Sequence, residues 1–253
     1  MWFDNHCHLT SLSIPAEDAV TAAAEAGVTR LLTVGCTVPD SIQAAALADR
    51  FDRVWSTAGV HPHDAKDGME GLEDLLGRPS VVAVGECGLD YHYDHSPRDV
   101  QADVFLRQVE LANRHHLPLV VHSREAWDDT FDLLDRAGVP ERTVFHCFTG
   151  GPDEARAALE RGAFVSFSGI VTFPSAEDLR EAARITPTDR ILVETDSPYL
   201  APVPLRGKPN QPANVAIVGE YLADLLSVPA DELAGITTAN ANTLFGLPAT
   251  GSP

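Results

Sequence analysis

Short apolar, β-branched segments recur along the whole chain, and this recurrence restricts the fold more than any other feature. Eight such segments occur in 253 residues, and stretches with helical spacing of apolar residues lie between them. The segments begin at Trp2, Arg30, Val54, Val81, Leu117, Thr143, Ala163 and Ile191. Near-continuous apolar runs are typical of parallel strands that are buried on both faces by helices.

Two of the intervening stretches show clear helix signals. Residues 15–28 carry a proline at a plausible first turn and a glycine near the end, and residues 98–116 have apolar residues at helical spacing. Eight βα units in about 250 residues indicate an α/β protein with a (β/α)8 TIM barrel. No linker or composition shift marks a boundary, so we predict one domain over residues 1–253, with a core over about 2–247.

Composition excludes several classes of protein. Hydrophobic residues make up 44% of the chain, enough for a substantial core, whereas 18 basic and 37 acidic residues give a formal net charge of −19. Such a surface repels polyanions, so any nucleic-acid substrate needs local attraction. The beginning of the chain lacks a basic leader with an apolar run, and no stretch of about 18 apolar residues occurs. We expect a cytoplasmic protein without membrane insertion and without an obligate protein partner.

The cysteines do not form a recognisable metal or redox motif. Cys7, Cys36, Cys87 and Cys147 all lie in apolar, strand-like segments, and none belongs to a Cys-x-x-Cys pair. This pattern argues against a zinc ribbon or a redox-active disulfide. We expect the four side chains to be small buried fillers.

Ionisable residues gather at the C-terminal ends of the strand segments. His6 and His8 lie one residue apart, so in an extended strand they face the same side, about 7 Å apart at their Cα atoms. The complete set is His6, His8, His61, His63, Glu86, His122, His146 and Asp196. In a barrel the C-terminal strand ends share one face, on which active sites are built. We therefore expect residues distant in sequence to meet in one pocket.

This set is rich enough in nitrogen and oxygen ligands for two metal ions. We place one ion on His6, His8, Glu86 and Asp196, and the other on Glu86, His122 and His146. A carboxylate on a buried strand is costly unless it is paired or metal-bound, so Glu86 is the natural bridge. A carboxylated lysine bridge is disfavoured, because the two lysines, Lys66 and Lys208, lie in loops. Imidazole and carboxylate ligands suit Zn or Mn better than Mg, and the ion stays open among these three.

The remaining histidines have weaker assignments. We expect His61 to orient substrate and His63 to lie beside it, either in contact with substrate or behind the ligands. Asp196 has an alternative interpretation as a turn cap, because Asp before Ser-Pro commonly begins a turn.

Several segments, taken in order, resemble the TatD family of metal-dependent hydrolases. They are HCHL, GVHPH, VGECGLDYHYDHSPRDVQADVFLRQVELA, LPLVVHSREAWDD, FHCFTG, SFSGIVTF, ETDSPYLAPVPLRGKPNQPANV and ITTANANTLFGL. The agreement extends from residue 3 to about residue 247. The resemblance implies an amidohydrolase-like barrel, a two-metal site and deoxyribonuclease activity, often 3′→5′ exonuclease action on single-stranded DNA. It also implies that His6, His8, Glu86, His122, His146 and Asp196 occupy ligand positions.

The chain departs from the family pattern at a few positions. Cys87 replaces a frequent aliphatic residue, and the loop LRGKPN, with Leu205 and Pro209, is less basic than is common. Arg206 remains in this loop and Arg124 follows the fifth strand segment, so both are candidates for phosphate contacts.

The expected chemistry is hydrolysis of a phosphodiester in DNA by water activated between two divalent ions. Glu86 would bridge the ions, and Asp196 would help to take the proton of the water. Two alternatives come from other classes of protein. One is a metal-dependent hydrolase of another ester or amide, such as an aminoacyl-tRNA ester or a lactone. The other is a non-enzymatic scaffold that holds a structural metal. Structural metal sites are usually closed around a single ion.

Overall fold

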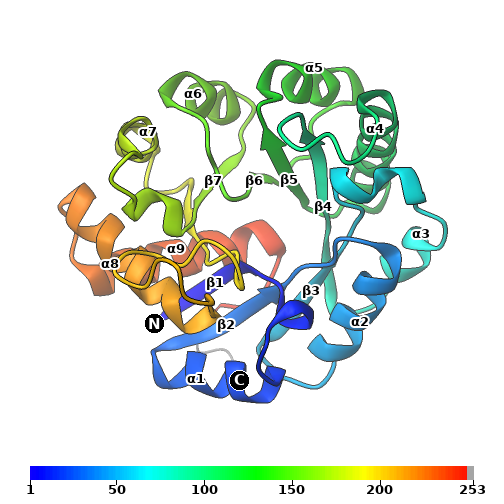
Figure 1. The fold of residues 1–253 in the computed structure, drawn as a ribbon. Coiled ribbons are helices and arrows are strands. Elements are labelled where there is room, and N and C mark those ends of the chain that lie inside the picture. Colours follow the sequence, from blue (N-terminus) through cyan, green and yellow to red (C-terminus); the bar gives the residue numbers. More distant parts are fainter. Residues whose placement is uncertain (250–253) are drawn as a thin grey trace.

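The structure, a computed structural model, describes residues 1–249 and forms a ring of parallel strands surrounded by helices (Figure 1). The strands are β1 (Trp2–Cys7), β2 (Val28–Thr33), β3 (Val54–Ala58), β4 (Val81–Asp90), β5 (Leu119–Arg124), β6 (Thr143–Phe145), β7 (Phe164–Phe167) and β8 (Ile191–Val193). All eight predicted strand segments form strands, and the predicted (β/α)8 barrel is confirmed. The assignment of residues 1–253 to one domain stays a prediction, and residues 250–253 lie outside the described part.

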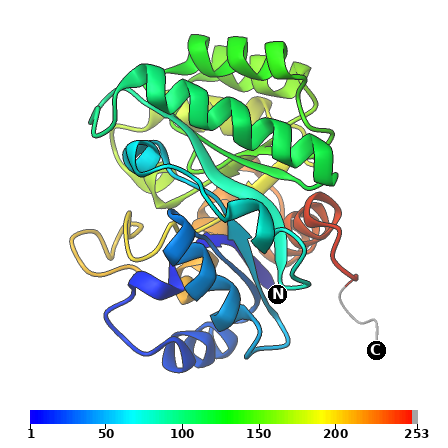
Figure 2. The same cartoon turned by 90° about the vertical axis from the view of Figure 1, so that its right-hand side faces the viewer.

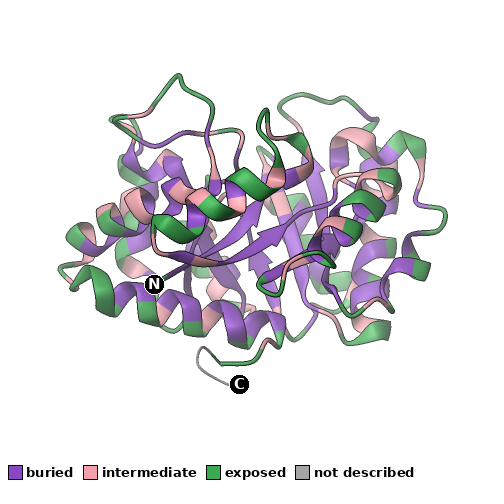
Figure 3. Ribbon diagram, turned by 90° about the horizontal axis from the view of Figure 1, so that it is seen from below, coloured by how far each residue is buried: buried purple, intermediate pink, exposed green. Residues whose placement is uncertain are grey.

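The helices alternate with the strands and cover the outside of the barrel. In the described part they are α1 (Ala16–Glu25), α2 (Val38–Ala48), α3 (Leu72–Leu75), α4 (Arg98–His115), α5 (Trp127–Ala137), α6 (Pro152–Glu160), α7 (Glu177–Ile185), α8 (Val215–Leu226) and α9 (Ala230–Phe245). In Figure 3 the helices carry buried, purple residues on their inner sides and exposed, green residues on their outer sides. None of the helices within residues 1–249 is both long and apolar enough to cross a lipid bilayer.

The interior of the barrel is apolar at its N-terminal end. Side chains from seven strands form a separate inner cluster with residues of α9, among them Phe3, Leu192, Leu244 and Phe245. Figure 2 shows α9 and the N-terminus at one end of the barrel and the long yellow loop after β8 at the other. Because α9 covers the N-terminal end, the C-terminal end is the face left for a site.

The barrel closes mainly between β1 itself and the residues that follow β8. A single isolated bridge joins Cys7 to Ser197, and the Asp196 N–H donates to the His6 carbonyl at 2.9 Å. The buried Asp4 carboxylate accepts hydrogen bonds from the Thr195 N–H at 2.8 Å and from the Thr195 hydroxyl at 2.6 Å. The closure therefore holds His6 and Asp196 side by side.

One irregularity in strand pairing directs a side chain into the C-terminal end. In β4 the register shifts between Val84 and Cys87, so that Gly85 and Glu86 together face one residue of β5. Gly85 has φ 131°, and a Cβ there would lie 2.6 Å from the Val120 carbonyl oxygen. Only glycine fits this position, which forms a β-bulge. Glu86 was expected at the end of its strand, but it lies in the middle of β4, and this bulge re-aims its side chain.

Candidate metal centre

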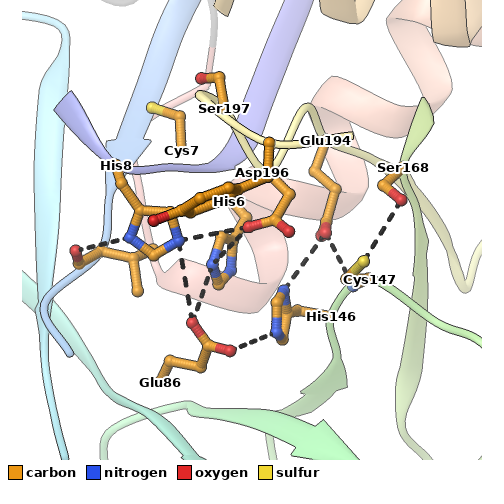
Figure 4. A network of polar contacts seen from close by, with 12 residues as sticks. His6, Cys7, His8, Glu86, His146, Cys147, Ser168, Glu194, Asp196 and Ser197 are labelled. Atoms are coloured by element: carbon orange, nitrogen blue, oxygen red, sulfur yellow. Dashed lines mark hydrogen bonds and ion pairs between the residues drawn. The ribbon is translucent and has the colours of Figure 1, made fainter. Parts of the chain in front are cut away.

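The six predicted ligands meet at the C-terminal end of the barrel around the carboxylate of Glu86. Figure 4 shows five of them, His6, His8, Glu86, His146 and Asp196. His6 and Glu86 belong to β1 and β4, and His122 lies in the second half of β5. His8, His146 and Asp196 lie one to three residues beyond the strands β1, β6 and β8. The expectation that strand ends bring these residues together is met. Whether they bind metal remains a proposal.

The two oxygens of Glu86 face different histidines. Oε2 lies 3.3 Å from His6 Nε2 and 3.9 Å from His8 Nε2. Oε1 lies 3.0 Å from His122 Nδ1 and 2.6 Å from His146 Nε2. The carboxylate therefore stands between two pairs of imidazoles, an arrangement that suits a group shared by two ions.

Asp196 lies beside the pair of imidazoles formed by His6 and His8. Its Oδ1 lies 3.2 Å from His8 Nε2 and 3.8 Å from His6 Nε2. Three compact sets of ligand atoms result, each able to surround one ion: His6 with His8 and Glu86, His6 with His146 and Asp196, and His61 with Glu86 and His122. His6 and His146 stack with ring centroids 3.8 Å apart, so the two halves of the cluster are contiguous.

His61 was expected to orient substrate, but it lies in contact with Glu86 inside the cluster of candidate ligands. Its Nε2 is 3.3 Å from Glu86 Oε1, and its side chain is only 12% exposed. Burial is the main cause that lowers the pKa of His61 to about 4, so its ring is neutral near pH 7. A neutral imidazole in this position is a potential ligand.

Two further observations show that the residues fit metal ions. Both ring nitrogens of His6 are buried and accept or donate no hydrogen bond within residues 1–249. An unsatisfied buried imidazole is costly, and a metal ion removes that cost by taking a nitrogen lone pair. Burial opposes ionisation of Glu86, but the neighbouring His146 and His61 lower the pKa of Glu86 well below its usual value, so it is a carboxylate.

Two carboxylates that the sequence did not single out support the histidines. Asp90 Oδ2 lies 3.1 Å from His122 Nε2 and 3.0 Å from His63 Nε2, on the side of His122 away from Glu86. Glu194 Oε1 lies 3.3 Å from His146 Nδ1 and accepts a hydrogen bond from the Cys147 N–H at 2.7 Å. Such contacts orient ligating imidazoles and select their tautomer. The signal in the sequence was the position of both acids in buried, strand-like runs, where an unpaired carboxylate is costly.

The Glu194 contact leads to a measurable expectation. Glu194→Gln should weaken metal affinity or lower kcat/KM by about 10- to 100-fold, because the amide disturbs the orientation of His146. Metal affinity is measured by competition with a chelator, alongside thermal melting. A lower melting temperature with unchanged metal affinity and kcat/KM would show that Glu194 only stabilises the fold.

Three of the residues predicted to contact substrate, His63, Arg124 and Arg206, lie at different places around the centre. His63 does not reach Glu86 and pairs with Asp90 instead. Arg124 ends β5, with its guanidinium 4.8 Å from the ring centroid of Tyr93. Arg206 lies on the exposed loop after β8, and its described contact is the ring of Phe173. None of these placements tests binding of substrate.

The expectation of four buried cysteines holds for only two of them. Cys7 and Cys87 are fully buried, whereas Cys36 and Cys147 are partly exposed at the centre. Cys36 Sγ lies 3.7 Å from His8 Nδ1 and 3.9 Å from Glu86 Oε2. The reason is that both residues come after their strands, where side chains line the mouth of the barrel.

Comparison with known proteins connects this centre with a family. A family model described as TatD related DNase matches residues 3–246. The chain belongs to the TatD family. A relative, YcfH of Escherichia coli K12, is named an uncharacterized metal-dependent hydrolase. It is 42% identical over 254 residues, with 97% of this chain and 96% of that protein covered.

Other TatD relatives agree over the same length. TatD of Escherichia coli K12, named a 3′-5′ ssDNA/RNA exonuclease, is 36% identical over 257 residues that cover 97% of this chain and 99% of that protein. The crystal structure of YJJV, a TatD homolog from Escherichia coli K12, superposes with a TM-score of 0.92, 30% identity and 98% coverage of both chains. The present protein is thus a metal-dependent hydrolase of the TatD family, and the alternative of a non-enzymatic scaffold is wrong.

Proposed function

We propose that this TatD-family hydrolase cleaves phosphodiester bonds of nucleic acids as a two-metal 3′→5′ exonuclease that prefers single-stranded DNA. The observation that carries the proposal is the placement of Glu86 between His6 and His8 on one side and His122 and His146 on the other. The name of Escherichia coli TatD, a 3′-5′ ssDNA/RNA exonuclease, supports this substrate class. The cytoplasm stays its predicted location.

The residues divide into two sites that share one carboxylate. His6, His8, Glu86 and Asp196 would hold one divalent ion, and Glu86, His122 and His146 the other, with His61 as a further donor to the second. Divalent ions in such sites lower the pKa of water and offset negative charge around phosphorus. Zn and Mn suit these ligands, and Mg remains open.

Side chains of the protein would take the proton of the attacking water and bind the substrate. Asp196 Oδ1 would accept the proton of the attacking water as the P–O3′ bond breaks, and O3′ of the shortened strand would take up a proton from solvent, which releases a 5′-mononucleotide. His8 Nε2 lies 3.2 Å from the same oxygen, so both atoms would lie at the first ion. Arg124, whose guanidinium lies beside the Tyr93 ring, would bind a neighbouring phosphate.

The proposal is tested with a 5′-labelled single-stranded oligonucleotide. Protein stripped of metal should leave the oligonucleotide intact, and protein reloaded separately with Mg, Mn or Zn should shorten it from the 3′ end with at least one ion. Metal content per chain is measured on the same samples. Double-stranded DNA of the same sequence is the comparison for strand preference.

Two outcomes would contradict the proposal. Fragments that shorten from the 5′ end would reverse the direction of attack. An intact oligonucleotide with protein shown to hold two ions would instead favour hydrolysis of another ester or amide, such as an aminoacyl-tRNA ester or a lactone.

A further inference from the structure

Two tyrosine rings project into solvent beside the candidate metal centre. The side chain of Tyr93, in the loop after β4, is 49% exposed, and that of Tyr199, in the loop after β8, is 58% exposed. Six large apolar side chains are exposed within residues 1–249, and these two are the only aromatic ones among them. Exposed aromatic rings next to a site are typical of surfaces that bind a ligand.

The backbone of Tyr199 is held firmly although its ring is free. Its N–H donates to the carbonyl of Asp196 at 2.9 Å, and its carbonyl accepts a hydrogen bond from the Asn210 amide at 2.7 Å. Asn210 is buried and also bonds the Thr195 carbonyl. The Tyr199 ring stands edge-on to the ring of His8, with centroids 6.1 Å apart. Because the backbone of Tyr199 is already fixed, a ligand that binds its ring next to the metal centre would lose little conformational entropy in the protein.

Tyr93 is held in a similar way on another loop. Its N–H donates to Asp90 Oδ1 at 2.9 Å, and the other oxygen of this carboxylate faces His122. Its ring, however, already has partners: the nearly parallel ring of His95, with centroids 5.4 Å apart, and the guanidinium of Arg124, 4.8 Å from the ring centroid. The rings of His63 and His92 stand edge-on to it. Tyr93 therefore helps to fix the loop and Arg124 beside the centre and does not offer an open face.

The two rings lie on opposite sides of the mouth of the barrel. The strands follow one another in the order β1 to β8 around the ring, and β8 returns to β1. Four steps in either direction separate β4 from β8, so the loops that carry Tyr93 and Tyr199 face each other across the Glu86 cluster.

We infer that Tyr199 is a stacking platform for unpaired bases, and that it selects single-stranded nucleic acid for cleavage. A base stacks on a protein ring only when it has left a duplex, and stacking tolerates every base because each has a π face. With a net charge of −19, the protein surface offers little general attraction for phosphates, so stacking supplies the missing binding. This inference rests on the proposed nuclease function.

The test compares an ordinary oligonucleotide with one whose last two 3′ nucleotides are tetrahydrofuran abasic units. The wild-type enzyme should prefer the ordinary strand by about 5- to 150-fold in kcat/KM, the range expected for stacking of one base. Tyr199→Ala should lose this preference by slowing cleavage of the ordinary strand, mainly through KM. Tyr199→Phe keeps the ring and should keep the preference.

Controls separate the ring from general effects of truncation. Ile42→Ala, which shortens an exposed side chain on α2, should keep the preference for the ordinary strand. Thermal melting confirms that each variant is folded. If Tyr199→Ala slows both strands equally or neither, the inference is wrong while the nuclease function stands. If the wild type cleaves no oligonucleotide, the proposed function itself is wrong.

Discussion

Replacement of Glu86 by glutamine should lower kcat/KM for oligonucleotide hydrolysis by about a thousandfold or more. Glutamine keeps the shape of the side chain but removes its charge and turns one oxygen into an amide nitrogen. That nitrogen would face either the His6 side or the His146 side, where it cannot act as a ligand. A loss of about 4 kcal/mol of charge stabilisation corresponds to three powers of ten in rate.

Metal stoichiometry distinguishes the loss of a bridge from a loss of folding. Glu86→Gln should remain folded and hold fewer ions per chain than the wild type, as measured by elemental analysis after dialysis. Glu220→Gln is the matched control, because Glu220 is exposed on α8. A Glu86→Gln variant with two ions and activity within tenfold of the wild type would show that Glu86 bridges nothing.

The fold was predictable because burial on both faces leaves a direct mark in the sequence. The run ILVETDSP, for example, shows where β8 lies, although only Ile191–Val193 is paired as strand. The following residues, Glu194 to Ser197, are polar, yet they complete the closure against β1. Hydrophobic patterning marks which segments are buried, whereas the exact end of a strand depends on hydrogen bonds with its neighbour.

The site was predictable to the extent that strand ends converge, and less so where contacts depend on local geometry. Eight acids and histidines were expected in one pocket, and the six predicted as ligands meet there around Glu86. The roles of Asp90 and Glu194 depend on which nitrogen of His122 and His146 faces them, and that orientation is set by packing. The bulge at Gly85 likewise follows from the close approach of Val120, a residue 35 positions away that no local pattern identifies.

Asp196→Asn should reduce kcat by about 10²- to 10⁴-fold, the range for loss of a positioned general base. Asparagine is similar in size but cannot accept a proton from water at neutral pH. The backbone should tolerate it, because Asp196 has φ 56°, a left-handed conformation in which asparagine and aspartate are both enriched. Single-turnover rates of metal-loaded protein, with thermal melting, are the measurement.

The neighbouring contacts decide how the Asp196 result is interpreted. Its Oδ1 faces His8 and His6, so the asparagine variant can lose either the base or an ion. Wild-type metal content with a low kcat would assign Asp196 Oδ1 to proton transfer, and a missing ion would assign it chiefly to metal binding. Asp224→Asn, at an exposed position near the end of α8, controls for the loss of one negative charge. An Asp196→Asn enzyme that keeps both its ions and its kcat would remove this residue from the proposed mechanism, and the proton of the water would then need an acceptor elsewhere in the cluster.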